Sequence, residues 1–559
     1  MRLCISPLFV LVSLSAVASL SGVASSAAQE GERRLVPIQS LRIDELMRAH
    51  WDDHQLQPGE EATAGEWCRR VYLDIIGRIP TNDELRTFLA DRRARRKANL
   101  VQRLLYSDQY TSEFARNWST VWTNLLIGGG GGSDNNSPVN RAGMQKYLRD
   151  SFAHNKTFDQ LATDLITATG ANKPGTDNFN GAVNFLIGKL DDNATQATAA
   201  TSRIFLGLQV QCTQCHNHPF NDWKQNQFWE LNAFFRQAVA LRRFESGSNM
   251  VDFVQLADQD FAGEGRTPRE AEVYYEQRNA TLSVAYPVFV TGAALSNRSG
   301  LVRDVNRRRE LARLIVDSDY LPRAAVNRMW GYFLGYGFTS PVDDLGPHNE
   351  PSHPELLDFL ASEFKNHNYD LKELIRWIVL SRPYSLSSKV TSLNESDNPS
   401  LGETPKFSHF YLRQMRAEQL YESLLVATRA AESSGGYEEQ ERLKGEWLQQ
   451  FTVAFDNDEG QEVTTFDGTI TQTLMLFNGP LINAAISDKP GSFLNSIATS
   501  SGSAENKVEL LFVTALARRP SREERDRANA LLGQRGDLLA TLQDLWWALL
   551  NSNEFILNH

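Results

Sequence analysis

The sequence predicts a mainly α-helical protein that consists of two helical domains with a small β-containing insertion between them. Two helix starts are marked at Thr81 and Ser521, because each follows a proline and precedes a glutamate by three residues, the pattern of a capping box. By contrast, residues 272–292 alternate β-branched and aromatic residues around a polar Arg-Asn-Ala-Thr, which predicts a hairpin. The chain has 559 residues, more than one hydrophobic core usually serves, so more than one domain is expected.

The first 28 residues have the layout of a cleaved signal peptide. An arginine precedes an apolar stretch from Ile5 to Val17, and small residues follow up to Ala27 or Ala28, where cleavage is expected. The apolar stretch is shorter than the ~20 residues that a membrane span needs. We therefore expect the mature chain to be exported to the periplasm or the cell exterior, without a transmembrane span.

The remaining chain is predicted to divide into a helical domain over 42–245, a small β-containing insertion over 246–300 and a C-terminal helical domain over 301–559. Residues 70–89 and 509–532 share one pattern, in which an apolar helix leads through an arginine and proline turn into a capped second helix. This similarity predicts related helical units in the two halves of the chain.

Composition and motifs exclude several classes of function. The net charge of −11 argues against nucleic acid as a partner, because an acidic surface repels phosphate. The sequence also contains no His-Glu-x-x-His, Gly-x-Ser-x-Gly or phosphate-loop motif, so common hydrolase and nucleotide-binding signatures are absent.

The most informative segment is QVQCTQCHNHPFNDW, residues 209–223. Apolar residues before it follow helical spacing, and continuing that spacing places Cys212, Cys215 and His216 on one face of a single helix. Two thiols and an imidazole presented in this way suit a covalently bound c-type haem, with two thioether bonds to the cysteines and His216 as an iron ligand. Aromatic residues are predicted to wall the macrocycle; they are Phe220, Trp223, Phe228, Trp229, Phe234 and Phe235.

Two other interpretations of this cluster stay open. A structural zinc site usually takes ligands from two separated pairs, and the chain has no second Cys-x-x-Cys, so His218 or a distant histidine would have to complete it. A disulfide or thiol role is the other alternative, although a redox Cys-x-x-Cys normally opens a helix, whereas here the helix is predicted to precede the cysteines.

A second axial iron ligand cannot be assigned from spacing. His218 and His353 are retained as additional metal-ligand candidates, although His218 is close in sequence to His216 and His353 follows Ser352, which is expected to cap a helix beginning with Pro354. Further candidates for the sixth ligand are His154, His348, His409 and Met329.

Three polar or reactive residues of interest lie outside this cluster. Cys68 is expected to be a buried free thiol. The adjacent Asp343 and Asp344 are expected to cap a helix rather than act together in acid-base chemistry.

Several long segments of the chain resemble the planctomycete secreted family, whose members join a cytochrome-type (PSCyt) domain to a PSD-type domain of unknown function. The segments are RRVYLDIIGRIPTNDEL, RIFLGLQVQCTQCHNHPFNDW, AAVNRMWGYFLGYGF, DDLGPHNEPSHPELLDFLASEF, IRWIVLSRPYSLSS and DLWWALLNSNEF. The resemblance runs from about Leu41 to the C-terminus, and it implies a cytochrome-like role for Cys212, Cys215 and His216.

The resulting functional hypothesis is an exported c-type haem protein, with one haem per chain, that exchanges electrons with a partner protein or a small substrate. The alternative is an extracellular binding or assembly protein whose Cys/His cluster is stabilised by a non-haem metal such as zinc. The sequence does not decide whether the protein is an enzyme.

Overall fold

The computed structural model describes residues 36–129, 131–132, 137–263, 271–429, 443–447, 482, 485–490 and 492–559. The predicted signal peptide, residues 1–28, lies outside the described residues. Within the described part of the chain, none of the helices combines the length and the apolar character needed to cross a membrane.

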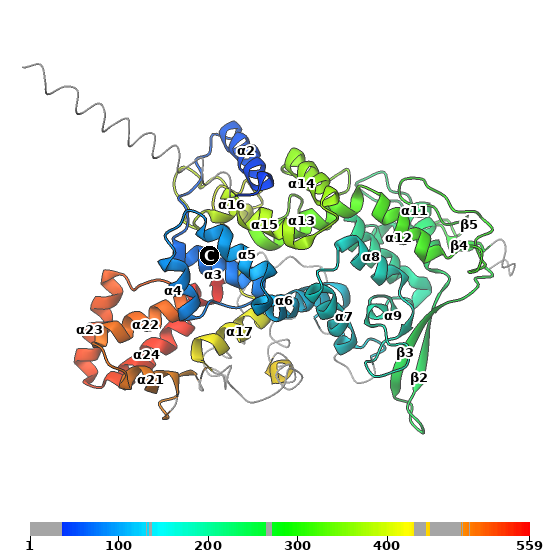
Figure 1. Ribbon diagram of the computed structural model, residues 1–559. Coiled ribbons are helices and arrows are strands. Elements are labelled where there is room, and N and C mark those ends of the chain that lie inside the picture. Colours follow the sequence, from blue (N-terminus) through cyan, green and yellow to red (C-terminus); the bar gives the residue numbers. More distant parts are fainter. Residues whose placement is uncertain are drawn as a thin grey trace, which may run out of the picture.

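The mainly α-helical fold class is confirmed. The helices of the first half are α2 (Ile38–Asp53), α3 (Ala64–Ile76), α4 (Asn82–Ala90), α5 (Arg96–Tyr106), α6 (Asp108–Ile127), α7 (Arg141–Ala153), α8 (Phe158–Thr167), α9 (Asn184–Ile187), α10 (Thr195–Thr201) and α11 (Gln225–Asn232) (Figure 1). Those of the second half are α12 (Arg307–Asp317), α13 (Tyr320–Leu334), α14 (Pro354–Asn366), α15 (Leu371–Val379), α16 (Arg382–Ser385), α17 (Ala417–Thr428), α21 (Phe493–Thr499), α22 (Ala504–Leu516), α23 (Arg522–Arg535), α24 (Leu538–Leu550) and α25 (Asn553–Ile556).

Both predicted capping boxes are present. The Thr81 hydroxyl accepts a hydrogen bond from the Glu84 backbone N–H, and the Glu84 carboxylate accepts one from the Thr81 N–H, at 3.3 and 2.7 Å. Ser521 and Glu524 repeat this exchange at the start of α23. Each box therefore satisfies backbone donors that a helix start leaves unpaired.

The same arginine-glutamate arrangement accompanies each box, with the arginine three residues before the capping residue. Arg78 binds Glu84 and Glu113, and Arg518 binds Glu524 and Glu554 in the same way. This common arrangement supports the predicted relation between the two helical units.

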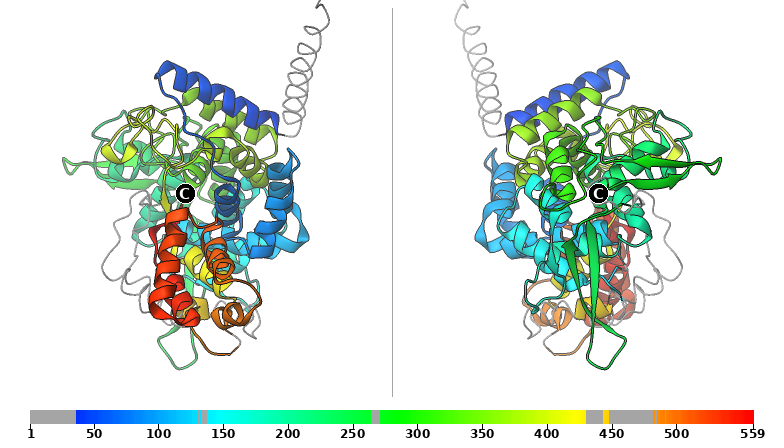
Figure 2. Two further views of the ribbon diagram at one scale, coloured as in Figure 1. Left: turned by 90° about the vertical axis from the view of Figure 1, so that its left-hand side faces the viewer. Right: turned by 90° about the vertical axis from the view of Figure 1, so that its right-hand side faces the viewer.

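Among the described residues, the strands form three small antiparallel sheets. The largest has the order β1 (Gly170–Ala171), β3 (Val251–Asp258), β2 (Ala238–Phe244), with Ala238 opposite Asp258. The β2–β3 ribbon projects from the helical body (Figure 2). The predicted hairpin is confirmed as β4 (Val273–Glu276) and β5 (Leu282–Ala285), and β6 (Arg413–Gln414) pairs with β7 (Leu557–Asn558).

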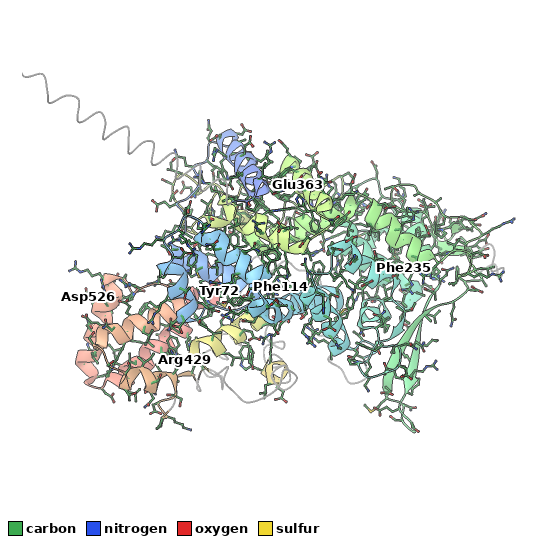
Figure 3. The ribbon with its side chains drawn as sticks, in the orientation of Figure 1. Tyr72, Phe114, Phe235, Glu363, Arg429 and Asp526 are labelled. Atoms are coloured by element: carbon green, nitrogen blue, oxygen red, sulfur yellow. The ribbon has the colours of Figure 1, made fainter. Side chains whose placement is uncertain are left out.

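Helix α3 contributes to two hydrophobic cores. Its residues Trp67, Val71 and Tyr72 belong to the main core, which extends along the chain from Ile43 to Tyr411 and also includes Ala517. Figure 3 labels Tyr72 and also Phe114 of α6, and Tyr72 contacts that helix through Tyr110, with ring centroids 6.2 Å apart. Leu73 on the same helix belongs to the second core, which otherwise consists of Ile79 and residues from Met415 to Ile556.

A buried carboxylate on α3 joins three distant segments. Asp74 is 1% exposed, and its Oδ2 accepts hydrogen bonds from Tyr384 Oη and Arg413 Nη2, each at 2.8 Å. Its Oδ1 accepts a third from Asn558 Nδ2, also at 2.8 Å. Residues from α16, β6 and β7 are thereby fixed around one side chain of α3.

Replacing this carboxylate should destabilise the whole protein. The variant Asp74→Ala leaves the charge of Arg413 buried without its partner, a change that typically costs about 3–5 kcal/mol. Urea denaturation should therefore show a large fall in the free energy of unfolding, whereas Asp177→Ala, at an exposed aspartate, should not. Equal stability of the two variants would contradict this assignment.

Candidate functional site

The helix before the cysteines ends earlier than its sequence predicts. Helix α10 continues as a π-helical turn over Ser202–Leu206 and stops at Gly207, whose φ is +65°. The left-handed backbone favours glycine here, and a Cβ would lie 2.8 Å from Leu345 Cδ1, so that side chain would have to shift. The predicted placement of Cys212, Cys215 and His216 on the same face of this helix is therefore wrong.

The cysteines instead lie on a separate short element. Cys212 is within a 3-10 helix over Gln211–Gln214, Cys215 follows at its C-terminal end, and His216 comes after it. The Gln214 carbonyl accepts hydrogen bonds from Gln225 Nε2 and Trp229 Nε1, each at 3.1 Å. These two hydrogen bonds anchor the backbone of the segment. Both thiols are free and exposed, so the reactive side chains reach solvent.

Backbone groups accept a hydrogen bond from Nδ1 of His216 but donate one to Nδ1 of His218. His216 Nδ1 lies 2.6 Å from the Asn217 carbonyl oxygen, which can only accept, so Nδ1 carries the hydrogen and Nε2 keeps its lone pair. His218 Nδ1 accepts from the Phe220 backbone N–H at 3.2 Å. Burial and then the neighbouring His348 lower the pKa of His218.

A loop of the C-terminal half packs against this segment. The Leu345 N–H donates to the Gly207 carbonyl at 2.6 Å, and Gln209 Nε2 donates to Asp343 Oδ1 at 2.8 Å. Asp344 Oδ2 lies 3.0 Å from His348 Nε2. The expectation that Asp343 and Asp344 cap a helix is therefore wrong, because both side chains bind groups on or beside the cysteine segment.

His348 is the sixth-ligand candidate that the structure brings to the cysteine segment. Its ring centroid lies 5.2 Å from that of His218, and its Nδ1 lies 3.2 Å from Asn221 Nδ2. Sequence spacing gave it no preference over the other candidates. Its position in the segment DDLGPHNE, beside the two aspartates, was the available signal.

The structure places His353 elsewhere, at the start of α14 beside α2. His353 is 5% exposed and its ring centroid lies 3.9 Å from that of His50. His353 is itself the N-cap residue of α14, and its side chain makes no capping hydrogen bond. The expectation that Ser352 caps this helix is therefore wrong. Ser352 Oγ instead forms a hydrogen bond with His353 Nδ1 at 2.8 Å. Of the other candidates, His154 ends α7, His409 lies beside Asp397, and Met329 belongs to the main core.

The predicted aromatic wall is only partly present. Phe228, Phe234 and Phe235 are buried in the main core, and Figure 3 shows Phe235 among the elements of the β-containing half. Trp229 stacks on Tyr275 with centroids 5.8 Å apart. Phe220, by contrast, is 79% exposed on the cysteine segment itself. An apolar surface is therefore available beside the thiols, but fewer rings provide it than predicted.

The residues of the zinc alternative are not assembled. Throughout the described ranges, no three histidine, cysteine, aspartate or glutamate side chains are arranged to hold a metal ion. His218 Nδ1 is already used by the Phe220 N–H. A zinc site at Cys212 and Cys215 would therefore require a different conformation of this segment.

The three cysteines in the described part of the chain should differ sharply in reactivity. Cys68 is 0% exposed, and burial raises the pKa of its thiol, whereas Cys212 and Cys215 are exposed. Because the thiolate is the reactive form, iodoacetamide should modify Cys212 and Cys215 in the native protein and Cys68 only after denaturation. Peptide mapping by mass spectrometry measures this, and equal labelling of Cys68 in the native state would contradict it.

The contact between His50 and His353 should make stability depend on pH. Burial and then His54 lower the pKa of His50 to about 4, and burial also lowers the pKa of His353. In an unfolded chain both rings have a pKa of about 6.5. The stability that these neutral rings contribute is therefore fully present above that pH and falls as the pH drops towards 4.

His50→Gln should make this fall in the free energy of unfolding less steep between pH 7 and 4.5. His154→Gln, at an exposed histidine, is the control and should leave the slope unchanged. Urea titrations at several pH values measure both slopes, and an unaltered slope in His50→Gln would count against the assignment.

Two families match the chain, in the order that its motifs suggested. Residues 42–240 match PSCyt2, described as a protein of unknown function (DUF1549), and residues 307–532 match PSD1, described as a protein of unknown function (DUF1553). No curated protein and no solved structure matches the chain. The chain therefore combines a PSCyt2 match with a following PSD1 match, the two-domain order of the family that its motifs resemble.

Proposed function

We propose that this chain is an exported redox protein that binds one c-type haem through Cys212, Cys215 and His216. The observation that carries the proposal is the combination of two exposed free thiols with a histidine whose Nδ1 donates to a backbone carbonyl, leaving Nε2 available. Metal-binding histidines characteristically use one ring nitrogen for the metal and donate the other N–H to an oxygen atom. The donor set therefore fits a haem iron and its two thioether bonds.

The surroundings of the cysteine segment support the same function. The thiols are accessible for bond formation, and the hydrogen bonds to the Gln214 carbonyl hold the backbone that carries them. The exposed Phe220 offers an apolar surface that a porphyrin would cover. When bound, the haem supplies one-electron chemistry at its iron, while the protein sets the iron ligand and the polarity around it.

The name of the first family suggests a cytochrome-like role and agrees with this proposal, but its description gives no reaction. Export is part of the proposal because the sequence predicts a signal peptide over residues 1–28. The redox partner is expected to be another protein or a small substrate.

Expression together with a haem-attachment system tests the proposal. The purified protein should retain haem after denaturation and give about one equivalent in a pyridine haemochrome assay. Cys212→Ser/Cys215→Ser should lose the covalent haem, whereas Cys68→Ser, at a buried cysteine outside the site, should keep it.

The competing zinc-stabilised binding protein gives a different result in the same preparation. Colourless protein that contains about one equivalent of zinc and unfolds with a chelator would refute the haem proposal and favour that alternative.

A further inference from the structure

Helix α2 covers one edge of the helical body and meets α14 at a pair of stacked histidines. Figure 1 shows α2 at the outer edge of the molecule, where it packs against α14, α15 and α16. The ring centroid of His50, near the end of α2, lies 3.9 Å from that of His353, the residue that precedes α14. Nε2 of each ring is buried and has no hydrogen-bond partner. The contact therefore favours the neutral form of both rings, because protonation would bury a charged N–H group without an acceptor.

The groups around the two rings do not offset this cost. Those that face His50 come from the end of α2 and from the segment before β6; they are His54, Asp53, Lys406 and Asp397. Burial and then His54 lower the pKa of His50 to about 4, although Asp53 and Asp397 act in the opposite direction. Burial, and then His50 and His54, lower the pKa of His353. Both rings therefore resist protonation as long as α2 stays in place.

One carboxyl on α2 acts in the opposite direction. Asp44 accepts a hydrogen bond from the Arg382 backbone N–H at 2.6 Å, and burial raises the pKa of its carboxyl to about 6. The burial of Asp44 therefore becomes more favourable as the pH falls from 7 to 5. The two histidines outweigh this single carboxyl, so acid weakens the contact of α2 with the body.

The chain that follows α2 is held to the body by its own backbone hydrogen bonds. The Gln57 N–H donates to the Leu393 carbonyl at 3.3 Å, and the Gly59 N–H donates to the Ser408 carbonyl at 2.8 Å. Gln55 lies in a turn between α2 and this segment. Helix α2 can therefore leave the body while the segment after it stays in place, which is a local opening and not global unfolding.

We propose that acid releases α2 from the body of the protein. When His50 and His353 take up protons, α2 separates from α14, α15 and α16 while the rest of the chain stays folded. Separation uncovers the apolar side of α2, formed by Ile43, Met47 and Trp51, each of which is 1% exposed or less in the closed state. The inference does not depend on haem, since none of these residues belongs to the cysteine segment.

Hydrogen–deuterium exchange of the full-length protein at pH 7.5 and 5.0 tests this release. Protection factors, which remove the effect of pH on intrinsic exchange, should fall about a hundredfold in α2 at pH 5.0. This value combines about thirtyfold from each buried histidine with about tenfold from Asp44 in the opposite direction. Peptides from α13, in the main core, should remain protected.

Two results would overturn the inference. Unchanged protection of α2 at pH 5.0 would show that the histidines do not control its contact with the body. Loss of protection to the same level in α2 and α13 would show that the protein unfolds as a whole.

A histidine variant tests the cause of the release. His50→Gln removes one of the two titrating rings, so the acid-induced fall in α2 protection should shrink to about threefold. His154→Gln, at an exposed histidine, is the control and should behave like the wild-type protein. A fall in His50→Gln as large as that of the wild type would contradict the assignment.

A second variant tests the same scheme without altering the histidine contact. Asp44→Asn keeps an oxygen that can accept from the Arg382 N–H but cannot titrate. Because the opposing carboxyl is removed, the acid-induced fall in α2 protection should grow to about a thousandfold. A fall no larger than that of the wild-type protein would count against the proposal, even if His50→Gln did not fold.

Discussion

The buried carboxylate of Asp74 is the constraint on which the architecture depends. A buried charge is stable only when it is paired and hydrogen-bonded, and Asp74 obtains its partners from Tyr384, Arg413 and Asn558. All three come from the C-terminal half of the chain, although α3 lies within the PSCyt2 match. Arg69, on the same helix as Asp74, strengthens this contact between the two halves, because its guanidinium donates to the carbonyl oxygens of Phe555 and Leu557. Figure 1 shows the result, with the C-terminus beside α3.

Features with local causes were predictable from sequence. A capping box depends on two residues three apart, so Thr81 with Glu84 and Ser521 with Glu524 could be found without knowledge of the fold. The β4–β5 hairpin follows from alternation around a short polar turn, which is equally local. The helical fold class rests on many such signals. The motifs of the chain were specific enough to indicate both families.

Features that depend on distant contacts were missed. The end of the helix at Gly207 could not be predicted from apolar spacing, because its cause includes Leu345, which packs where a Cβ would lie. The surroundings of two histidines also depend on distant contacts. His353 packs against His50 of α2, and His348 reaches the cysteine segment only through the fold. At the candidate site, the sequence therefore offered Cys212, Cys215 and His216 as candidates but gave no sign of the neighbours that the C-terminal half supplies.

The hydrogen bonds of Asp74 also impose an order on biosynthesis. A ribosome makes α3 early, but Asn558 leaves it only after almost the entire remaining chain has been translated. Until then the nascent N-terminal half carries a buried aspartate that lacks one of its native hydrogen bonds. The final packing of that half is therefore delayed until late in synthesis, and the nascent chain needs protection from aggregation during that time.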